Sequence, residues 1–162
     1  MAIMQKTEPR ILVVDDDRAL ADSLVEFLST LGYRTTSAYT GYEGLTRFEQ
    51  DEYQLVITDL MMPEMDGIQL LEAIRKRDKD VSVIVLTGFG SIESAVQAIK
   101  RGAYDYITKP FKFEETEVIV ERAIEKDTIF RQMRRFRGMF YFILFTVPLW
   151  ILLGVLGILA WR

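Results

Sequence analysis

The amino-acid sequence predicts an α/β fold: a doubly wound, five-stranded parallel sheet followed by one C-terminal transmembrane helix. Short apolar runs alternate with longer amphipathic stretches from Arg10 onward, which is the order of repeated strand and helix pairs. The apolar runs are almost continuous, as expected for strands that are buried on both faces. A final stretch over residues 139–161 is apolar and uncharged, and it predicts the last helix.

The elements are expected in five pairs. The strands are predicted at 11–14, 33–38, 55–58, 81–87 and 103–107. The helices are predicted where apolar residues recur every three or four positions, at 20–31, 42–50, 68–77, 91–101 and 113–137. Asp17 is expected to cap the first helix and Gly32 to end it, while Asp66 and Gly67 mark a loop and the start of the third helix. Ligands of such sheets bind where the strands end, so functional residues are expected there.

Composition excludes several classes of site. The 162 residues have room for one domain of about 100 to 150 residues and an appendage. The sequence contains no cysteine and no histidine, which excludes disulfides, the usual zinc sites and histidine acid–base chemistry within it. If a phosphoryl group arrives from a histidine, another protein carries that histidine.

Charge is divided unevenly along the chain. The net charge is −4, but the segment after Asp127 holds five arginines and no acidic residue, so it contributes +5 and residues 1–130 carry −9. Affinity for nucleic acid rests largely on lysine and arginine that neutralise phosphates. No nucleic-acid partner is therefore expected for the acidic part.

Polar side chains follow four of the predicted strands: Asp15 and Asp16, then Asp59, Thr87 and Lys109. Carboxylates without histidine or cysteine form a site of hard oxygen ligands, which favours Mg²⁺ as the cofactor. With a metal to screen the charge, one carboxylate can attack an activated phosphoryl group. Lys109 would pair with the developing anion, and the Thr87 hydroxyl would donate a hydrogen bond to it.

Four segments together resemble the receiver domains of two-component response regulators. They are ILVVDDD (11–17), LVITDLMMPEMDG (55–67), VIVLTGFG (83–90) and GAYDYITKPF (102–111), and the resemblance covers roughly residues 9–125. It implies the flavodoxin-like fold of chemotaxis receivers. It also implies a domain that is phosphorylated by a separate histidine kinase or phosphotransfer protein.

The resemblance assigns roles to individual residues. It implies that Asp59 is the phosphoacceptor, that Asp16 and Asp59 ligate Mg²⁺ directly, and that Asp15 acts through water. It implies that the backbone carbonyl of Met61 completes the protein ligands. Lys109 matches the phosphate-binding lysine, joined to Pro110 by a bond that is usually cis, and this is an isomer that only proline makes inexpensive.

The resemblance also implies a switch. Thr87 and Tyr106 match a coupled pair in which the hydroxyl moves toward the phosphoryl group and the aromatic ring turns inward. A packed aromatic is the alternative reading of Tyr106. The fourth helix, fifth strand and fifth helix would then form the readout surface.

The tail is expected to anchor the domain to the inner membrane. Residues 139–161 would span about 34 Å as a helix, enough for a hydrocarbon core of about 30 Å. Arg131, Arg134, Arg135 and Arg137 precede this stretch, which predicts that the domain faces the cytoplasm and that lipid head groups contact the arginines. The expected organisation is therefore an extension, a receiver domain, a basic juxtamembrane helix and a single span, at 1–8, 9–125, 126–138 and 139–161.

The expected function is a switch without an enzymatic output domain, which signals by contact with a membrane-associated protein. Two alternatives remain open: an anchored phosphate sink or relay intermediate, and a structural tether. The apolar residues Met61 and Phe89 occupy positions that commonly tune dephosphorylation in the family, so slow self-hydrolysis is expected. A homodimer through residues 118–137 also remains open, although the apolar positions there keep no clean heptad.

Overall fold

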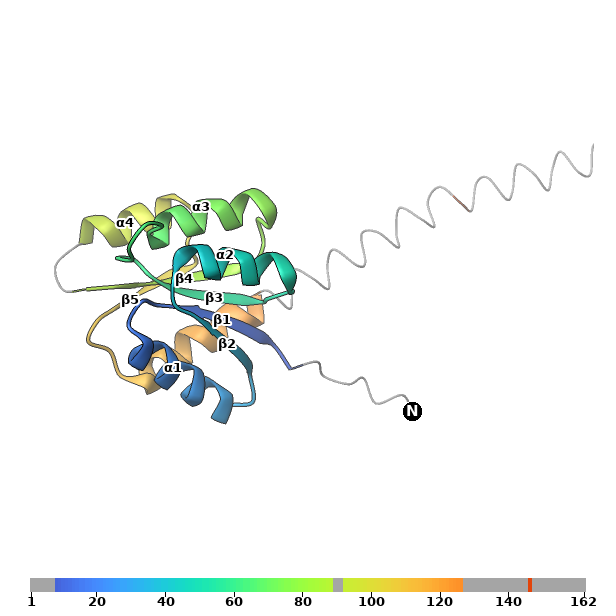
Figure 1. Ribbon diagram of the computed structural model, residues 1–162. Coiled ribbons are helices and arrows are strands. Elements are labelled where there is room, and N and C mark those ends of the chain that lie inside the picture. Colours follow the sequence, from blue (N-terminus) through green and yellow to red (C-terminus); the bar gives the residue numbers. More distant parts are fainter. Residues whose placement is uncertain (1–7, 89–91, 127–145, 147–162) are drawn as a thin grey trace, which may run out of the picture. The chain divides into compact units, whose positions relative to one another are not determined.

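A computed structural model describes residues 8–88, 92–126 and 146 of the chain (Figure 1). The strands are β1 (Arg10–Val14), β2 (Arg34–Ala38), β3 (Leu55–Asp59), β4 (Ser82–Thr87) and β5 (Asp105–Thr108). The helices between them are α1 (Arg18–Thr30), α2 (Gly41–Gln50), α3 (Gly67–Arg77) and α4 (Ile92–Lys100). Residues 113–126 are also helical and are called helix 113–126 below.

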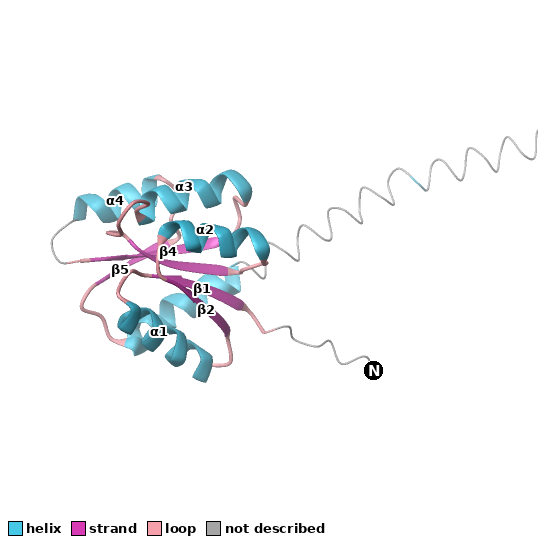
Figure 2. Ribbon diagram, in the orientation of Figure 1, coloured by secondary structure: helices cyan, strands magenta, loops and turns pink. Residues whose placement is uncertain are grey.

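All five strands are parallel and lie in the order β2-β1-β3-β4-β5, which confirms the predicted doubly wound α/β fold. Every residue of β3 and β4 is buried, as the continuous apolar runs predicted. Figure 2 shows the sheet between two layers of helix, with α2, α3 and α4 on one face and α1 on the other. The chain reverses its direction across the sheet between β1 and β3, which places the predicted crevice between the ends of these two strands.

Alternation along each strand divides the interior into two cores. Leu12 and Val14 of β1 pack with buried residues of α3, whereas Ile11 and Val13 pack with α1 and helix 113–126. This follows from the period of two in a strand, where successive side chains point to opposite faces. Each buried Leu, Ile or Val contributes about 1.5–3 kcal/mol relative to an exposed side chain, so the two cores hold the strand ends in place.

Local signals set the helix boundaries next to the strand ends. Asp17 caps α1 and accepts a hydrogen bond from the backbone N–H of Leu20 at 3.2 Å. Asp66 caps α3 in a capping box with Gln69, through bonds of 2.7 and 3.0 Å. Gly32 lies beyond the end of α1 with a φ of 87°, which glycine adopts without strain. These three helix signals are confirmed.

The predicted tail falls almost entirely outside the described residues. Among residues 8–88, 92–126 and 146, no helix combines the length and the apolar character that a membrane span requires. The predicted span over residues 139–161 contributes only Thr146 to this set. Of the predicted juxtamembrane helix over 126–138, only Lys126 is described. Both segments stay predictions.

Candidate functional site

The chemically distinctive side chains lie at the edge of the sheet where the strands end. Asp15 and Asp16 follow β1, Asp59 is the last residue of β3, and Lys109 follows β5. Asp15 and Asp59 are 1% and 6% exposed, although both are acidic. Charged groups are seldom buried unless they are paired or bind a metal, so we expect a partner for each of these two carboxylates.

Lys109 supplies the pairing. Its ammonium lies 2.7 Å from Asp15 Oδ2 and 2.5 Å from Asp59 Oδ1, and thus bridges the two buried carboxylates. The backbone N–H of Lys109 donates to the carbonyl oxygen of Thr87 at 2.6 Å, which ties the residue to the end of β4. The Lys109–Pro110 peptide bond is cis. The lysine is therefore held by backbone and side chain together.

The second oxygen of each buried carboxylate accepts a backbone hydrogen bond. Asp59 Oδ2 accepts from the N–H of Met61 at 2.7 Å, and Asp15 Oδ1 accepts from the N–H of Asp17 at 2.9 Å. Asp16 differs: it is exposed, and it has no hydrogen bond or ion pair with another described residue. Asp16 is therefore the carboxylate whose oxygens are open to an incoming ligand.

Burial and pairing act on the ionisation of the site in opposite directions. Burial raises the pKa of Asp15, and the hydrogen bonds from Lys109 and from the N–H of Asp17 oppose this only in part. Burial alone would lower the pKa of Lys109, but hydrogen bonds to Asp15 and Asp59 and their charges raise it above its ordinary value. Lys109 is therefore protonated at neutral pH and carries the charge that offsets one carboxylate.

The donor set fits Mg²⁺. Asp15, Asp16 and Asp59 each offer a carboxylate oxygen, and these oxygens lie within 4.8 Å of one another. Mg²⁺ prefers oxygen ligands, binds through a small number of carboxylates and keeps several waters. Three carboxylates and one ammonium leave a net charge of −2, which a divalent cation would balance. The carbonyl of Met61 remains a predicted ligand, and its side chain is 76% exposed.

The predicted switch pair lies on neighbouring strands. Thr87 is 3% exposed at the end of β4, and its hydroxyl lies 3.4 Å from the carbonyl oxygen of Gly88, to which it donates. Tyr106 of β5 pairs with Val85 of β4, and its side chain is 41% exposed. The ring is thus outward in this structure. The roles of Thr87 and Tyr106 as a switch stay predictions.

One contact of the site was not expected from the sequence. A Cβ atom added to Gly67 would lie 2.1 Å from the carbonyl oxygen of Asp59, so the first turn of α3 packs directly on the backbone of the phosphoacceptor candidate. The N–H of Gly67 also donates to the carbonyl oxygen of Leu60 at 3.0 Å. The Asp66-Gly67 pair signals a turn in the sequence, but it does not reveal which segment the turn meets.

Comparison with known proteins gives relatives of the same kind. The model of the response regulator receiver domain matches residues 11–121. Over 114 residues the chain is 38% identical to the transcriptional regulatory protein ZraR of Salmonella typhimurium, a match that covers 70% of this chain and 26% of that protein. It is 35% identical over 125 residues to the regulatory protein AtoC of Escherichia coli, covering 77% and 27%. The chain thus matches about a quarter of the length of these two relatives.

Solved structures agree with the sequence matches. A response regulator receiver domain protein from Clostridium thermocellum is similar with a TM-score of 0.72 and 31% identity, and the match covers 75% of this chain and 98% of that one. The matched family segment includes the strand ends that carry Asp15, Asp59 and Lys109. The chain therefore belongs to the response regulator receiver domain family.

Proposed function

We propose that this chain is a phosphorylation-switched receiver, tethered to the cytoplasmic face of the inner membrane by residues 139–161. Asp59 accepts a phosphoryl group from a histidine kinase or phosphotransfer protein, with Mg²⁺ held by Asp15, Asp16, Asp59 and the Met61 carbonyl. The resulting change is read by a membrane-associated protein partner. The family membership supports phosphorylation, whereas the tether rests on the apolar segment and the arginines before it.

The observation that carries the proposal is the bridge from Lys109 to Asp15 and Asp59. Buried like charges without a ligand destabilise a fold by several kcal/mol, so a purely structural role for these carboxylates is unfavourable. Lys109 offsets one negative charge and lies beside the candidate acceptor. A phosphoryl group on Asp59 would lie next to this ammonium and could accept a charge-assisted hydrogen bond from it. Such hydrogen bonds are stronger than those between neutral groups.

The phosphoryl group is transferred from a phosphohistidine of the donor to Asp59. A carboxylate oxygen of Asp59 forms a bond to phosphorus, the bond from phosphorus to the imidazole nitrogen breaks, and that nitrogen keeps the electron pair. Lys109 stabilises the negative charge that the phosphoryl oxygens bring into the site. Mg²⁺, when bound, neutralises these oxygens. The donor histidine lies outside residues 1–162, because this sequence contains none.

Slow loss of the phosphoryl group favours a switch over a phosphate sink. Hydrolysis requires a water that is oriented toward phosphorus. Met61 lies two residues after Asp59, at a position from which a side chain could orient this water. Its side chain is highly exposed, and its thioether is only a weak hydrogen-bond acceptor. We therefore expect a phosphoryl lifetime of minutes or longer. A lifetime of seconds would favour the sink.

The proposal is tested on full-length protein in membranes. Isolated membranes carrying the wild-type chain are incubated with acetyl phosphate, with Mg²⁺ or with a chelator, and the protein is resolved on a phosphate-affinity gel. The expected result is a shifted band only with Mg²⁺, absent from Asp59→Asn, in a protein that alkaline carbonate does not extract. No shift in the wild type would overturn the switch, and carbonate extraction would overturn the tether.

A further inference from the structure

The described chain leaves the receiver domain at the edge where the strands begin. The hydroxyl of Ser82, the first residue of β4, donates to the carbonyl oxygen of Ala123 at 3.1 Å. The ammonium of Lys126 lies 4.8 Å from the ring centre of Tyr104, directly before β5. Helix 113–126 thus carries the chain from the edge with Asp59 to the opposite edge.

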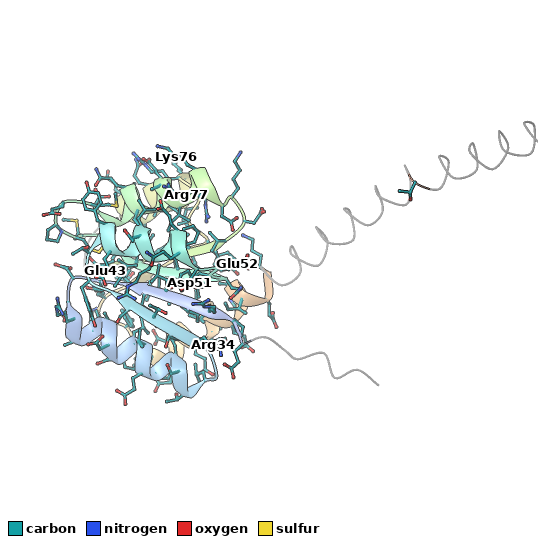
Figure 3. All side chains as sticks on the ribbon, turned by 45° about the vertical axis from the view of Figure 1, so that its right-hand side comes forward. Arg34, Glu43, Asp51, Glu52, Lys76 and Arg77 are labelled. Atoms are coloured by element: carbon teal, nitrogen blue, oxygen red, sulfur yellow. The ribbon has the colours of Figure 1, made fainter. Side chains whose placement is uncertain are left out.

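Cationic side chains gather at this same edge. Helices that connect parallel strands run back across the sheet, so the ends of α3 and α4 lie where β4 and β5 begin. The α3–α4 basic cluster is defined here as Arg75, Lys76, Arg77, Lys79, Lys100 and Arg101. Lys76 and Arg77 point outward from the domain in Figure 3. The cluster therefore lies at the same edge as the end of helix 113–126, which packs on the other face of the sheet from α3.

Three cations of the cluster are engaged within the domain. Arg77 pairs with Glu49, and Arg101 pairs with Glu72. Arg75 donates to the carbonyl oxygen of Gly102, from Nε at 3.0 Å and from a terminal nitrogen at 2.8 Å. These three arginines join α2, α3 and the end of α4 into one surface.

The three lysines of the cluster are not engaged. Lys76, Lys79 and Lys100 are exposed, and their ammonium groups have no ion pair or hydrogen bond with another described residue. On α2, α3 and the loop after α3, Glu49, Glu72, Asp78 and Asp80 face these cations, and the six cations and these four carboxylates sum to +2. This is the opposite sign to the −9 of residues 1–130.

The edge is less basic toward β2. There Arg10 pairs with Asp51 at 2.8 Å, and Arg34 pairs with Glu8 at 3.2 Å. Glu52 is exposed beside the first of these pairs (Figure 3). A negatively charged surface would therefore attract the α3–α4 side of the edge and not the β2 side.

We infer that the α3–α4 basic cluster rests on the anionic head groups of the bilayer through Lys76, Lys79 and Lys100, with the Asp59 edge turned away. This inference rests on the proposed membrane tether. Only residues 127–138 separate the described domain from the predicted span, so contact of the domain with the bilayer is intramolecular and is favoured by a high effective concentration. Each lysine near an anionic surface favours contact by roughly fivefold.

This orientation keeps Asp59 available. A five-residue strand covers roughly 15 Å between the two edges of the sheet, whereas charges are screened over about 8 Å at physiological salt. A phosphoryl group on Asp59 would therefore not repel the bilayer from the basic cluster. A kinase histidine could reach Asp59 from the cytoplasm while the domain stays on the membrane.

The test is an amine footprint of the full chain reconstituted in vesicles. The vesicles contain phosphatidylcholine alone or with phosphatidylglycerol, floated vesicles are acetylated, and each lysine is quantified by mass spectrometry. Lys112, exposed at the opposite edge and without an ion pair in the described part of the chain, is the internal control. We expect Lys76, Lys79 and Lys100 to react roughly fivefold more slowly in anionic vesicles at low salt, with Lys112 unchanged.

A double variant distinguishes contact of the basic cluster with the bilayer from a general slowing of acetylation near an anionic surface. In Lys76→Gln/Lys79→Gln the protection of Lys100 should fall toward its value in neutral vesicles, whereas Lys112→Gln should leave that protection intact. Equal labelling of the three lysines in both vesicle types, in a chain that floats with them, would overturn the orientation alone. A chain that fails to float with neutral vesicles would overturn the tether and, with it, this inference.

Discussion

The ammonium of Lys109 lies within 2.7 Å of carboxylate oxygens from both Asp15 and Asp59, and Asp16 stands beside them without a partner among the described residues. The three carboxylates therefore differ in what they can do. Asp15 and Asp59 are oriented by Lys109 and by backbone N–H groups, whereas Asp16 is open to solvent. The three carboxylates and one ammonium of this site leave a negative charge that a divalent cation would balance.

Removing the ammonium should impair phosphoryl acceptance and also destabilise the domain, because Asp15 and Asp59 lose their cation, so rates are compared under conditions where the variant is folded. In Lys109→Met we expect phosphorylation of Asp59 by acetyl phosphate to slow by about 100-fold, because one preorganised donor to a developing anion contributes on that order. Initial rates on phosphate-affinity gels measure the effect. Lys112→Met is the matched control and should keep the wild-type rate. A wild-type rate in Lys109→Met would contradict the role of Lys109.

Mg²⁺ should stabilise the folded domain through Asp16. A ligand that binds only the folded state adds about 2.7 kcal/mol at 100 times its Kd, so the thermal midpoint should rise with Mg²⁺ concentration. In Asp16→Ala this rise should largely disappear. Calorimetry on detergent-solubilised protein measures it. Glu52→Ala, at the far edge of the sheet, should respond to Mg²⁺ as the wild type does, and an equal response in Asp16→Ala would contradict this ligand assignment.

At the scale of elements, caps and close contacts fix where each strand end lies. The capping box of Asp66 and Gln69 starts α3, and Gly67 then meets the Asp59 carbonyl. At α2, Thr40 accepts from the N–H of Glu43, while the Glu43 carboxylate accepts from the N–H of Tyr39. These local bonds determine the ends of the elements around the site, and substitutions there act on the site through the backbone.

Adding one methyl group at Gly67 should displace the backbone of Asp59. The new Cβ has no room against a backbone oxygen, so Gly67→Ala is expected to destabilise the domain by about 1–3 kcal/mol. Urea unfolding measures this loss. A Cβ at Gly88 would meet nothing within 4 Å, so Gly88→Ala should change stability far less. Equal stabilities of the two variants would contradict the close packing of α3 on β3.

The bonds of Glu43 should make stability depend on pH. The N–H of Tyr39 lowers the pKa of Glu43, burial opposes this, and Arg47 adds to the lowering. A lowered folded pKa contributes stability above the unfolded value of about 4.3, and this stability is lost as pH falls through the folded pKa. The destabilisation in Glu43→Gln should therefore be largest at neutral pH and shrink below about pH 4. Urea unfolding free energies across this range measure it, and a constant difference would contradict the linkage.

At the scale of the whole molecule, the sequence predicts the fold well because strand burial and helix period are local properties. The apolar run over 55–58 predicts β3, which the structure extends to Asp59. The predicted strand over 103–107 is instead β5 at Asp105–Thr108; the N–H of Ala103 still donates to the carbonyl oxygen of Ala98 in α4. Local periodicity therefore predicts which strands and helices are present more reliably than it predicts the residues at which they begin and end.

The site could be predicted in part. Residues at the ends of neighbouring parallel strands lie close together, so the sequence predicts that Asp15, Asp16 and Asp59 form one site. Their carboxylate oxygens are ligands that Mg²⁺ prefers, so the sequence also predicts the metal. The bridge of Lys109 to Asp15 joins residues 94 positions apart, and no periodic pattern fixes such a contact. The packing of Gly67 on Asp59 likewise depends on the loop that joins β3 to α3.

Asp59 is the residue that we expect to accept the phosphoryl group in the membrane-bound protein. Borohydride reduces an aspartyl phosphate to homoserine, so the most direct measurement is peptide mass spectrometry of the full chain, reduced in membranes after incubation with acetyl phosphate and Mg²⁺. We predict homoserine at position 59, and none there when Mg²⁺ is chelated. Homoserine at another aspartate, or intact Asp59 in a protein that is phosphorylated elsewhere, would contradict it.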